Sequence, residues 1–338
     1  MKKIFPILFS FLGILLFSQQ VSLETIFNDK ISIRALEVYD NKVWYSGTDS
    51  KFGYVDLKNP QNHKQIKLSE KKLQFRTLGQ DKNSFYAINI ESPAEFFKID
   101  KKSLKYEIVF KDTAKTAFYD ALHFVNNKLA YTFSDADKDG KLKLALFKNG
   151  KWSMLENDVK LNEGEAAFAA SNTNIASYRN FVWIATGGKT SRILRLFDNG
   201  HIYAWDIFNT PFVQGESSQG MYSIDFYDDK FGIAVGGDYT KQADNIDNIA
   251  TTNDGGKTWQ VQASGKNAGY TTCVKIKPGS QGKEIIAVGD QHISYSSDFG
   301  RTWKKISDEK GFFVCQWIDG NTIVFAGKDK ISVMELKL

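Results

Sequence analysis

Residues 251–259 read Thr-Thr-Asn-Asp-Gly-Gly-Lys-Thr-Trp, and residues 296–303 repeat the pattern as Ser-Ser-Asp-Phe-Gly-Arg-Thr-Trp. Each copy follows a strand-like run and precedes another. The Asp can accept backbone N–H bonds inside a tight turn, and Gly tolerates the positive φ angles that such a turn needs. The outgoing Thr and Trp suit a strand, and the indole is a large apolar anchor between packed sheets. We therefore assign a structural role to Asp254, Gly256, Thr258, Trp259, Asp298, Gly300, Thr302 and Trp303.

Strand-like runs recur along the chain at intervals of about 40–55 residues, which is typical of four-stranded propeller blades. The composition agrees, because 26 Gly, 5 Pro and 14% aromatic residues fit many short strands joined by tight turns. The last repeat has only three strands, Phe312–Trp317, Thr322–Phe325 and Ile331–Glu335. We expect Val21–Phe27 to supply its outer strand and so to remove exposed sheet edges. The predicted fold is all-β, a β-propeller of about seven blades whose ring is closed by the N-terminal strand.

The N-terminal residues 1–18 are typical of a secretory signal peptide. Lys2 and Lys3 precede the apolar run Ile4–Phe17, and Ser18 is a small residue at the expected cleavage point. This run is shorter than the ~20 residues that span a bilayer, although a retained N-terminal anchor is the alternative. There is no Cys near the cleavage point, so a lipoprotein anchor is not supported. We expect residues 19–338 to be one propeller domain, secreted or periplasmic, monomeric, and without a transmembrane segment once the signal is removed.

The net charge and the cysteine content limit the classes of partner and of structural site that the chain can have. Loss of Lys2 and Lys3 lowers the formal net charge by two, from +5 to +3. This near balance gives no indication of a nucleic-acid partner. The chain has two cysteines, Cys273 and Cys315, which excludes a disulfide framework and a zinc site built from cysteines. We expect buried free thiols, with a disulfide as the alternative in an oxidising compartment.

Three further segments carry a family resemblance: Gly-Glu-Ala-Ala-Phe-Ala-Ala-Ser-Asn-Thr (164–173), Ala-Val-Gly-Gly-Asp-Tyr (234–239) and Gly-Tyr-Thr-Thr-Cys-Val (269–274). Together with the repeated Asp–Gly–Trp motif, which resembles the Asp-box (BNR repeat) of sialidases and other β-propellers, they are similar to bacterial proteins related to photosystem II stability and assembly factors. The resemblance implies a secreted or periplasmic propeller that binds a partner protein. Such bacterial proteins often carry an oxidoreductase label. Thr271 stands where that family is expected to have Arg.

The expected inner strands align five polar residues at one mouth of the central channel: Arg34, Arg76, Asp120, Glu165 and Ser223. Guanidinium groups pair with carboxylates, and carboxylates accept hydrogen bonds from hydroxyl groups. The ring is therefore a candidate site for a charged or sugar-like group of an unknown protein or glycan partner. The alternative is a ring of ion pairs whose members bond to one another and line a water-filled channel without binding a ligand.

Residues 135–140, Asp-Ala-Asp-Lys-Asp-Gly, match the first half of a Ca²⁺ loop. The candidate ligands are Asp135, Asp137 and Asp139, although Leu146 stands where a complete loop needs Glu. The alternative is a solvated hairpin tip. No other cofactor is predicted. The segment 186–190, Thr-Gly-Gly-Lys-Thr, has Trp183 where a P-loop needs Gly, and no dinucleotide fingerprint supports the oxidoreductase label.

A glycan-processing enzyme of the sialidase type is the alternative function. Sialidases resemble one another in an Arg-Ile-Pro element and an arginine trio, but here Ala35-Leu36 follow Arg34. Arg34 and Arg76 would need a third arginine, from Arg179, Arg192 or Arg195. Catalysis would also need converging carboxylates with perturbed pKa values, and the candidates are Asp120, Glu163, Glu165 and Asp225. We therefore predict a binding or assembly module and name no catalytic residue.

Overall fold

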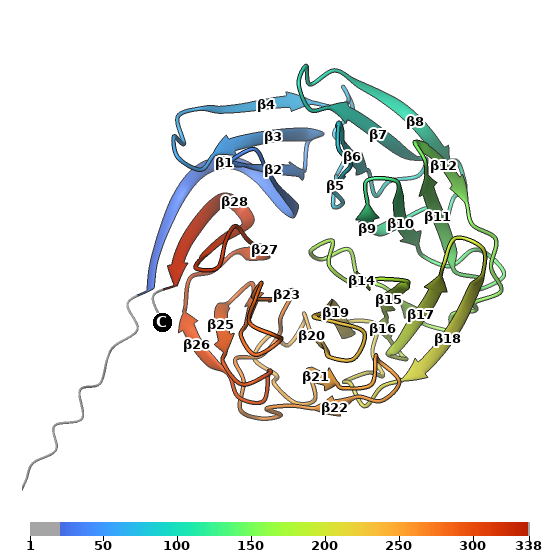
Figure 1. The fold of residues 1–338 in the computed structure, drawn as a ribbon, viewed down its shortest axis with the longest axis vertical. Helices are drawn as coiled ribbons and strands as arrows, with labels where there is room; N and C mark the ends of the chain where they lie inside the picture. Colours follow the sequence, from blue (N-terminus) through green and yellow to red (C-terminus); the bar gives the residue numbers. More distant parts are fainter. Residues whose placement is uncertain (1–20, 337–338) are drawn as a thin grey trace, which may run out of the picture.

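The computed structural model describes residues 21–336, which form an all-β ring of sheets around a central channel (Figure 1). This arrangement is a β-propeller, in agreement with the predicted fold class. Within residues 21–336, no helix has the length and apolar character needed to cross a membrane. The predicted signal peptide, residues 1–18, lies outside the described residues.

Six sheets make up the ring, each with antiparallel neighbours. The first contains, in order, β27 (Phe312–Trp317), β28 (Thr322–Leu336), β1 (Val21–Tyr39), β2 (Lys42–Gly47), β3 (Lys51–Asp56) and β4 (His63–Lys67). The second contains β5 (Gly79–Gln80), β6 (Ser84–Ile88), β7 (Ala94–Asp100) and β8 (Tyr106–Asp112). The third contains β9 (Tyr119–Asn126), β10 (Leu129–Ser134), β11 (Lys143–Lys148) and β12 (Lys151–Met154).

The remaining sheets continue around the ring. The fourth contains β14 (Ile175–Tyr178), β15 (Phe181–Ala185), β17 (Arg192–Asp198) and β18 (Tyr203–Asn209). The fifth contains, in order, β13 (Glu165–Ala166), β16 (Gly187–Gly188), β19 (Gln219–Phe226), β20 (Gly232–Asp238), β21 (Ile249–Thr252) and β22 (Gln260–Val261). The sixth contains β23 (Cys273–Ile276), β24 (Ile285–Gly289), β25 (His292–Ser296) and β26 (Lys304–Ser307).

The predicted count of seven blades is wrong. When each hydrogen-bonded sheet is counted as one blade, residues 21–336 form six. The reason is that the segments expected to form separate first and last blades belong to one continuous sheet, which is joined by the long strands β1 and β28. β1 spans 19 residues and pairs first with β28 and then with β2. The N-terminal strand is therefore not a separate piece that completes a last blade and closes a ring of seven. It is part of one six-stranded sheet.

The two ends of the described chain lie side by side within this sheet (Figure 1). Val21 lies opposite Leu336, and Phe27 lies opposite Ile331. The hydroxyl groups of Thr25 and Ser332 are 2.9 Å apart, within hydrogen-bonding distance. The pairing of β1 with β28 therefore satisfies backbone groups that unpaired strand edges would expose.

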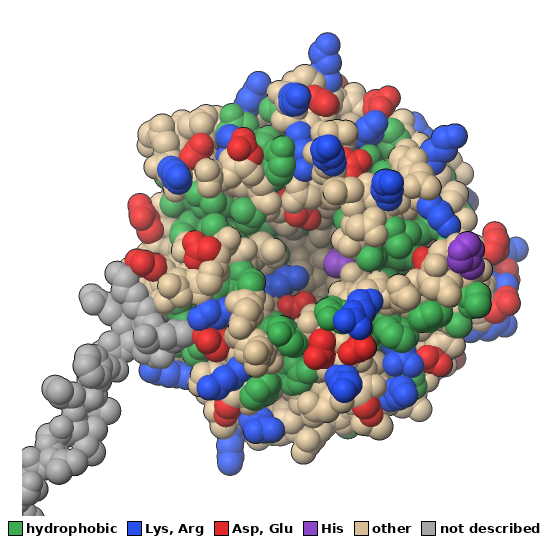
Figure 2. Space-filling model, in the orientation of Figure 1, with side chains coloured by type: hydrophobic (Ala, Val, Ile, Leu, Met, Phe, Trp, Pro, Cys, Tyr) green, Lys and Arg blue, Asp and Glu red, His purple; other side chains and the backbone are tan. Residues whose placement is uncertain are grey.

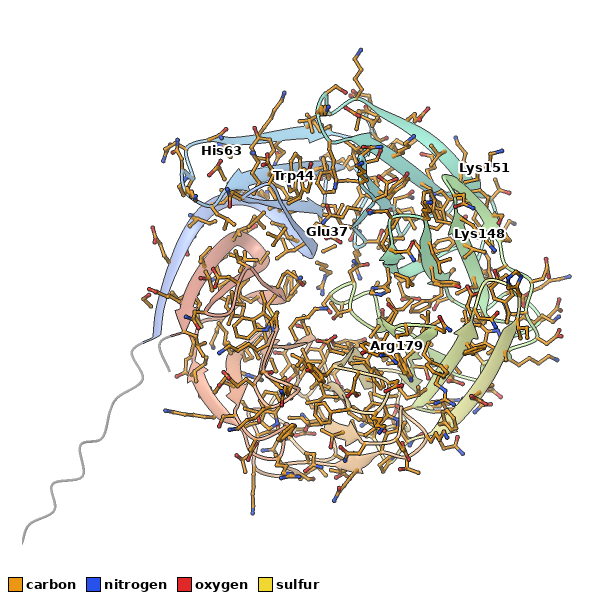
Figure 3. The ribbon with its side chains drawn as sticks, in the orientation of Figure 1. Glu37, Trp44, His63, Lys148, Lys151 and Arg179 are labelled. Carbon is orange, nitrogen blue, oxygen red and sulfur yellow. The ribbon has the colours of Figure 1, made fainter. Side chains whose placement is uncertain are left out.

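Aromatic rings fill the space between neighbouring sheets. The Trp44 ring of β2, labelled in Figure 3, lies 4.5 Å from the Phe85 ring of β6. The Trp183 ring of β15 stacks on Phe226 of β19, with centroids 3.7 Å apart and planes at 10°. Aromatic pairs of this kind contribute about 0.5–1.5 kcal/mol beyond the area they bury. These contacts fix the spacing of the sheets and leave their innermost strands to line the channel.

The turn at residues 251–259 joins β21 to β22 through a closed set of hydrogen bonds. The Asp254 carboxylate accepts one bond from the Thr258 amide (2.9 Å) and one from the Thr258 hydroxyl (2.6 Å). The Trp259 indole N–H donates to the Gly256 carbonyl at 3.0 Å. Gly255 and Gly256 have φ angles of 72° and 84°, in the region that favours glycine.

The turn at residues 296–303 joins β25 to β26 with the same bonds. The Asp298 carboxylate accepts from the Thr302 amide at 2.9 Å and from its hydroxyl at 2.7 Å. The Trp303 indole donates to the Gly300 carbonyl at 2.9 Å. We refer to these two segments as the Asp–Gly–Trp turns. Their matching geometry shows that the repeated residues form turns.

Candidate binding site

A cavity of about 630 Å³ lies at one end of the channel, and we call it the arginine cavity. Two of its lining residues are Arg34 and Arg76. Others, including Phe118 and Thr272, directly precede the innermost strands β9 and β23. The structure therefore brings together two of the five residues predicted for the channel mouth, and it surrounds them with side chains that the sequence analysis had not assigned to the site.

Strand bulges place three side chains in the arginine cavity. The registers of β1, β19 and β27 shift between Ile33 and Ala35, between Met221 and Ser223, and between Phe312 and Val314. The residues within these shifts, Arg34, Tyr222 and Phe313, all line the cavity. A bulge re-aims side chains relative to the regular alternation of a strand. The simple alternation used in a sequence alignment could therefore not identify Tyr222 and Phe313.

The Arg34 guanidinium is half-buried and has few partners. One nitrogen donates to the Ala170 carbonyl at 3.0 Å, and the group lies 4.2 Å from the centre of the Phe313 ring. Burial lowers the pKa of Arg34 to about 10, the positive charge of Arg76 adds to this effect, and Tyr270 and Asp290 oppose it. A guanidinium has five N–H donors, so most of those on Arg34 remain available to a ligand.

Arg76 is the second cation of the cavity. Within the described residues its hydrogen bond is to the Gln74 side-chain oxygen, at 3.3 Å. Burial lowers the pKa of Arg76, while the carboxylates of Asp120 and Glu91 act in the opposite direction. Two partly buried cations that repel each other, with few internal acceptors, form a local environment that favours an anion.

Aromatic rings form another part of the cavity wall. The rings of Phe168 and Tyr222 stack with centroids 4.0 Å apart and planes at 6°, and Tyr270 packs against Tyr222 at 87°. The Tyr222 hydroxyl donates to the Ser218 carbonyl at 2.7 Å, which fixes the ring. Tyr239 also lines the cavity and is 51% exposed. The arginine cavity therefore combines positive charge with flat apolar surfaces.

Asp120 lies at the start of β9 and is completely buried. Neither carboxylate oxygen has a hydrogen-bond partner among the described residues. Burial raises the pKa of Asp120 well above its usual value, the nearby Asp135 carboxylate adds to the effect, and Arg76 opposes it. Asp120 therefore interacts electrostatically with Arg76 but does not itself line the cavity.

The predicted positions of Glu165 and Ser223 need correction. Glu165 lies in β13, which pairs with β16, whereas β14 is the corresponding inner strand. Its buried carboxylate forms an ion pair with Arg192, with nitrogen–oxygen distances of 2.6–3.0 Å, and accepts the Thr186 hydroxyl at 2.6 Å. Ser223 is fully buried, and its hydroxyl lies 2.7 Å from that of Thr173. Both residues are thus bonded within the protein.

The arginines proposed to complete a trio lie elsewhere. Arg192 is bound to Glu165, and Arg195 pairs with the Asp206 carboxylate at 2.6 Å. Arg179 is exposed and lies over the Tyr178 ring. None of the three lines the arginine cavity. Glu163 is also turned away, since its side chain is 96% exposed beside Lys189.

The predicted Ca²⁺ ligands do not converge within the described residues. The Asp137 carboxylate accepts the amides of Asp139 (2.8 Å) and Lys141 (2.9 Å) and so stabilises its own turn. Burial raises the pKa of Asp135 to about 6, and this carboxylate interacts with Asp120. Residues 21–336 contain no group of three or more His, Cys, Asp or Glu side chains that could hold a metal ion.

A second cavity, of about 230 Å³, lies deeper in the channel wall, and we call it the channel cavity. Glu37, His123 and Lys275 line it, and the sequence analysis missed all three. Burial raises the pKa of Glu37 to about 7, although Gln80 donates to it at 2.7 Å. Burial lowers the pKa of His123 to about 4. Figure 3 shows Glu37 directed toward the centre of the ring, whereas His63 lies near its rim.

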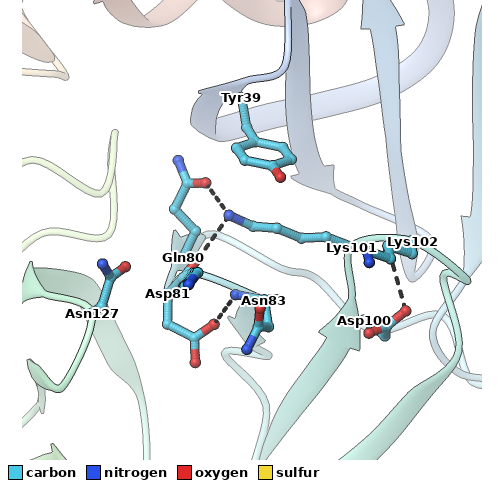
Figure 4. A pocket seen from close by; sticks show the side chains of 9 residues that line it. Tyr39, Gln80, Asp81, Asn83, Asp100, Lys101, Lys102 and Asn127 are labelled. Carbon is cyan, nitrogen blue, oxygen red and sulfur yellow. Dashed lines mark hydrogen bonds between the residues drawn. The ribbon is translucent and has the colours of Figure 1, made fainter.

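An open pocket of about 640 Å³ lies between the ends of the first and second sheets (Figure 4). Three lysines line it, and one of them, Lys101, donates to the Gln80 side chain and to the Asp81 carbonyl, both at 2.7 Å. The same ammonium lies 3.8 Å from the centre of the Tyr39 ring. These internal partners leave the Lys101 ammonium little capacity to bind a ligand. Figure 2 shows one face of the ring hollowed at its centre, with basic and acidic side chains around the hollow.

Comparison with solved structures supports the fold, whereas comparison with protein families and curated proteins found no match. No family model matches the chain, and no curated protein matches it. Among solved structures, the chain is similar to the one described as "YCF48 bound to D1 peptide". The TM-score is 0.67 at 12% sequence identity, and the match covers 96% of this chain and 99% of the other. This similarity, which extends over almost the whole length of both chains, shows that the protein has the β-propeller fold.

Proposed function

We propose that this protein is a binding or assembly scaffold that captures an extended, negatively charged segment of a protein partner in the arginine cavity. The observation that supports this proposal is that two partly buried guanidinium groups, each with one hydrogen bond to the described part of the chain, share a cavity with stacked aromatic rings. Arginine binds carboxylates through charge-assisted bonds in a fixed fork geometry.

The two parts of the cavity suit different parts of one ligand. A carboxylate placed between Arg34 and Arg76 would relieve their mutual repulsion, which contributes to the lowered pKa of Arg34. Apolar side chains or peptide groups of the same segment would pack on Phe168 and Tyr222. The similar structure is that of YCF48 bound to a D1 peptide, which supports a peptide ligand for this chain too. So does the resemblance of the sequence motifs to assembly factors.

The test is a binding measurement with peptides that end in a free carboxylate, compared with the same peptides amidated at the C-terminus. We expect R34A and R76A each to weaken binding of the carboxylate peptides by roughly 10–100-fold, because charge-assisted bonds contribute about 1.5–3 kcal/mol. R301A is the matched control, since Arg301 is exposed on the second Asp–Gly–Trp turn. Unchanged affinity in both R34A and R76A, with unchanged thermal stability, would exclude the arginine cavity.

A glycan that carries a carboxylate is the second ligand class, since Arg34 and Arg76 share one cavity. Hydrolysis of such a glycan would need a catalytic pair. A fluorogenic sialoside assay separates the two functions: turnover that is lost in R34A favours the enzyme, and binding without turnover favours the scaffold. The oxidoreductase label has no cofactor motif to support it and is not part of our proposal.

We further propose that the protein is exported and works as a monomer outside the cytoplasm. Lys2, Lys3 and the apolar run Ile4–Phe17 are the features that support export. Sequencing of the mature N-terminus from envelope and culture fractions tests it. A mature chain that begins near Gln19 is expected, and retention of Met1 in the cytoplasm would contradict export. Light scattering of the purified chain tests the monomer.

A further inference from the structure

The chain contains two cysteines, and the fold brings them together. The sulfur atoms of Cys273 and Cys315 are 3.8 Å apart, and both residues are 0% exposed. Cys273 lies in β23 and Cys315 in β27, which belong to different sheets. A bond between these sulfurs would therefore fasten two sheets of the ring that share no backbone ladder.

We infer that Cys273 and Cys315 form an oxidative modification site, which a small peroxide entering the channel cavity converts into a disulfide between two sheets. The inference does not rest on the function proposed above, because neither cysteine lines the arginine cavity.

The channel cavity gives the oxidant access. Cys315 lines this cavity together with Lys275 and Gln316. A volume of about 230 Å³ admits hydrogen peroxide but is too small for a bulky disulfide such as oxidised glutathione. Access from the channel thus selects small oxidants.

The surroundings favour a thiolate, the reactive form of cysteine, at Cys273, whereas burial and the neighbouring Cys273 sulfur raise the pKa of Cys315 well above its usual value. Burial acts to raise the pKa of Cys273, but the hydrogen bond to Cys315 and the Lys275 ammonium outweigh burial and lower this pKa. Either sulfur can donate in the bond between them, so one proton can be shared by the pair.

The reaction balances without a further cofactor. A thiolate of the pair attacks one peroxide oxygen, the O–O bond breaks, and the leaving hydroxide takes the remaining thiol proton and departs as water. The resulting sulfenic acid is attacked by the second sulfur as a thiolate, which forms the S–S bond and expels hydroxide. The hydroxide takes up the proton that the first thiol released. In total, two thiols and one peroxide give one disulfide and two waters.

The two strands are held close enough for the bond to form. The Thr272 hydroxyl donates to the Phe313 carbonyl at 2.7 Å, and the Trp317 indole donates to the Lys275 carbonyl at 3.3 Å. These bonds flank the sulfur pair on both sides. The sulfurs must approach by roughly 2 Å to reach the usual S–S distance of about 2.05 Å, and rotation of two short side chains can supply this.

The experiment treats the full-length, reduced protein with hydrogen peroxide, then alkylates it after unfolding and measures the intact mass. We expect both alkylatable thiols to disappear, the mass to fall by that of two hydrogens, and dithiothreitol to reverse the change. A peptide map should join the two cysteine-containing peptides. Because the bond closes a loop between residues 42 positions apart, the melting temperature should rise by about 5 °C.

Matched controls use the same protein. Oxidised glutathione at equal concentration should act at least roughly tenfold more slowly than peroxide, because access depends on the channel cavity. C273S and C315S should each keep one thiol and gain no melting-temperature increase. Two thiols that remain alkylatable in folded, peroxide-treated wild-type protein would overturn the inference, whether or not the serine variants fold. So would disulfides formed only between molecules.

Discussion

Carboxylates in two regions of this molecule behave in opposite ways. In the Asp–Gly–Trp turns, hydrogen bonds from the turn outweigh partial burial and lower the pKa values of Asp254 and Asp298. In the channel wall, burial raises the pKa of Glu37 to about 7 and that of Asp120 well above its usual value. The turns therefore use charge to stabilise the fold, whereas the channel holds charge at a cost to folding.

The arginines show the same contrast. Arg192 bonds to both Glu165 oxygens and also donates to the Lys160 carbonyl at 2.8 Å. Within residues 21–336, Arg34 at the channel has one hydrogen bond, to a carbonyl. Groups whose partners are inside the protein contribute to its structure, and groups without such partners are the ones left for a ligand.

The largest effect we expect comes from removing the buried indole of the first turn. Trp259 is 8% exposed and packs against Phe226, so W259A should lower the free energy of unfolding by about 3–5 kcal/mol. W303A is the matched control, because Trp303 makes the same indole bond but is only half-buried. Its loss should be roughly half as large. Denaturant unfolding measures both. Equal losses would show that burial does not distinguish the two turns.

A smaller effect on the free energy of unfolding, this time a stabilisation, is expected from replacing Glu37 in the channel wall. The pKa of Glu37 is about 7 in the folded protein, against 4.5 for an unperturbed glutamate. Below pH 4.5 the group is protonated in both states. Between pH 4.5 and 7 the unfolded chain releases its proton first, so stability is lost as pH rises. E37Q should therefore be more stable than wild type by about 1–2 kcal/mol at pH 8 and equal to it at pH 4.

Glu284 provides the control with the opposite sign. It accepts bonds from Lys277 at 2.6 Å and from Tyr295 at 2.8 Å, and these outweigh burial and lower its pKa. E284Q should therefore be less stable than wild type at pH 8 and closer to it at pH 4. Unfolding free energies measured across this range test both variants. A pH-independent difference for E37Q would show that Glu37 does not titrate as its burial requires.

The fold could be predicted because its strongest features are local. The bonds of each Asp–Gly–Trp turn join residues no more than four positions apart, so Asp254 and Thr258 mark the turn in the sequence itself. The blade count could not be predicted in the same way. Nothing in the sequence of Val21–Tyr39 indicates that one continuous strand serves two sets of partners, since this depends on how distant strands pair.

The candidate site was predictable only in part. Arg34 and Arg76 were identified because an alignment of the expected inner strands placed both at the channel mouth. Glu165 was misplaced because its partner, Arg192, is 27 residues away and holds it outside the inner strands. Tyr222 and Phe313 were missed because strand bulges direct them into the cavity. Bulges and long-range ion pairs depend on tertiary contacts and leave no periodic pattern in the sequence.

The smallest effect concerns Ca²⁺ at residues 135–140, which stays a prediction. Asp137 accepts the amide four residues later, as Asp254 and Asp298 do, so its carboxylate resembles those of the Asp–Gly–Trp turns. Asp135 instead interacts with Asp120 in the channel wall. Divided in this way, the three aspartates would give a weak site at best, with a dissociation constant near roughly 1 mM.

We therefore expect about 1 mM Ca²⁺ to raise the melting temperature by less than about 1 °C, since binding at one dissociation constant adds only about 0.4 kcal/mol. Calorimetry measures the heat of binding directly, and D139N is the variant to compare, because it removes one candidate carboxylate and keeps the backbone amide that Asp139 donates to the turn. No heat at all would withdraw the Ca²⁺ proposal. A Ca²⁺-induced rise of several degrees in the melting temperature that D139N abolishes would show a ligand site among turn carboxylates. That result would contradict the division in which turn carboxylates stabilise the fold and channel groups remain for ligands.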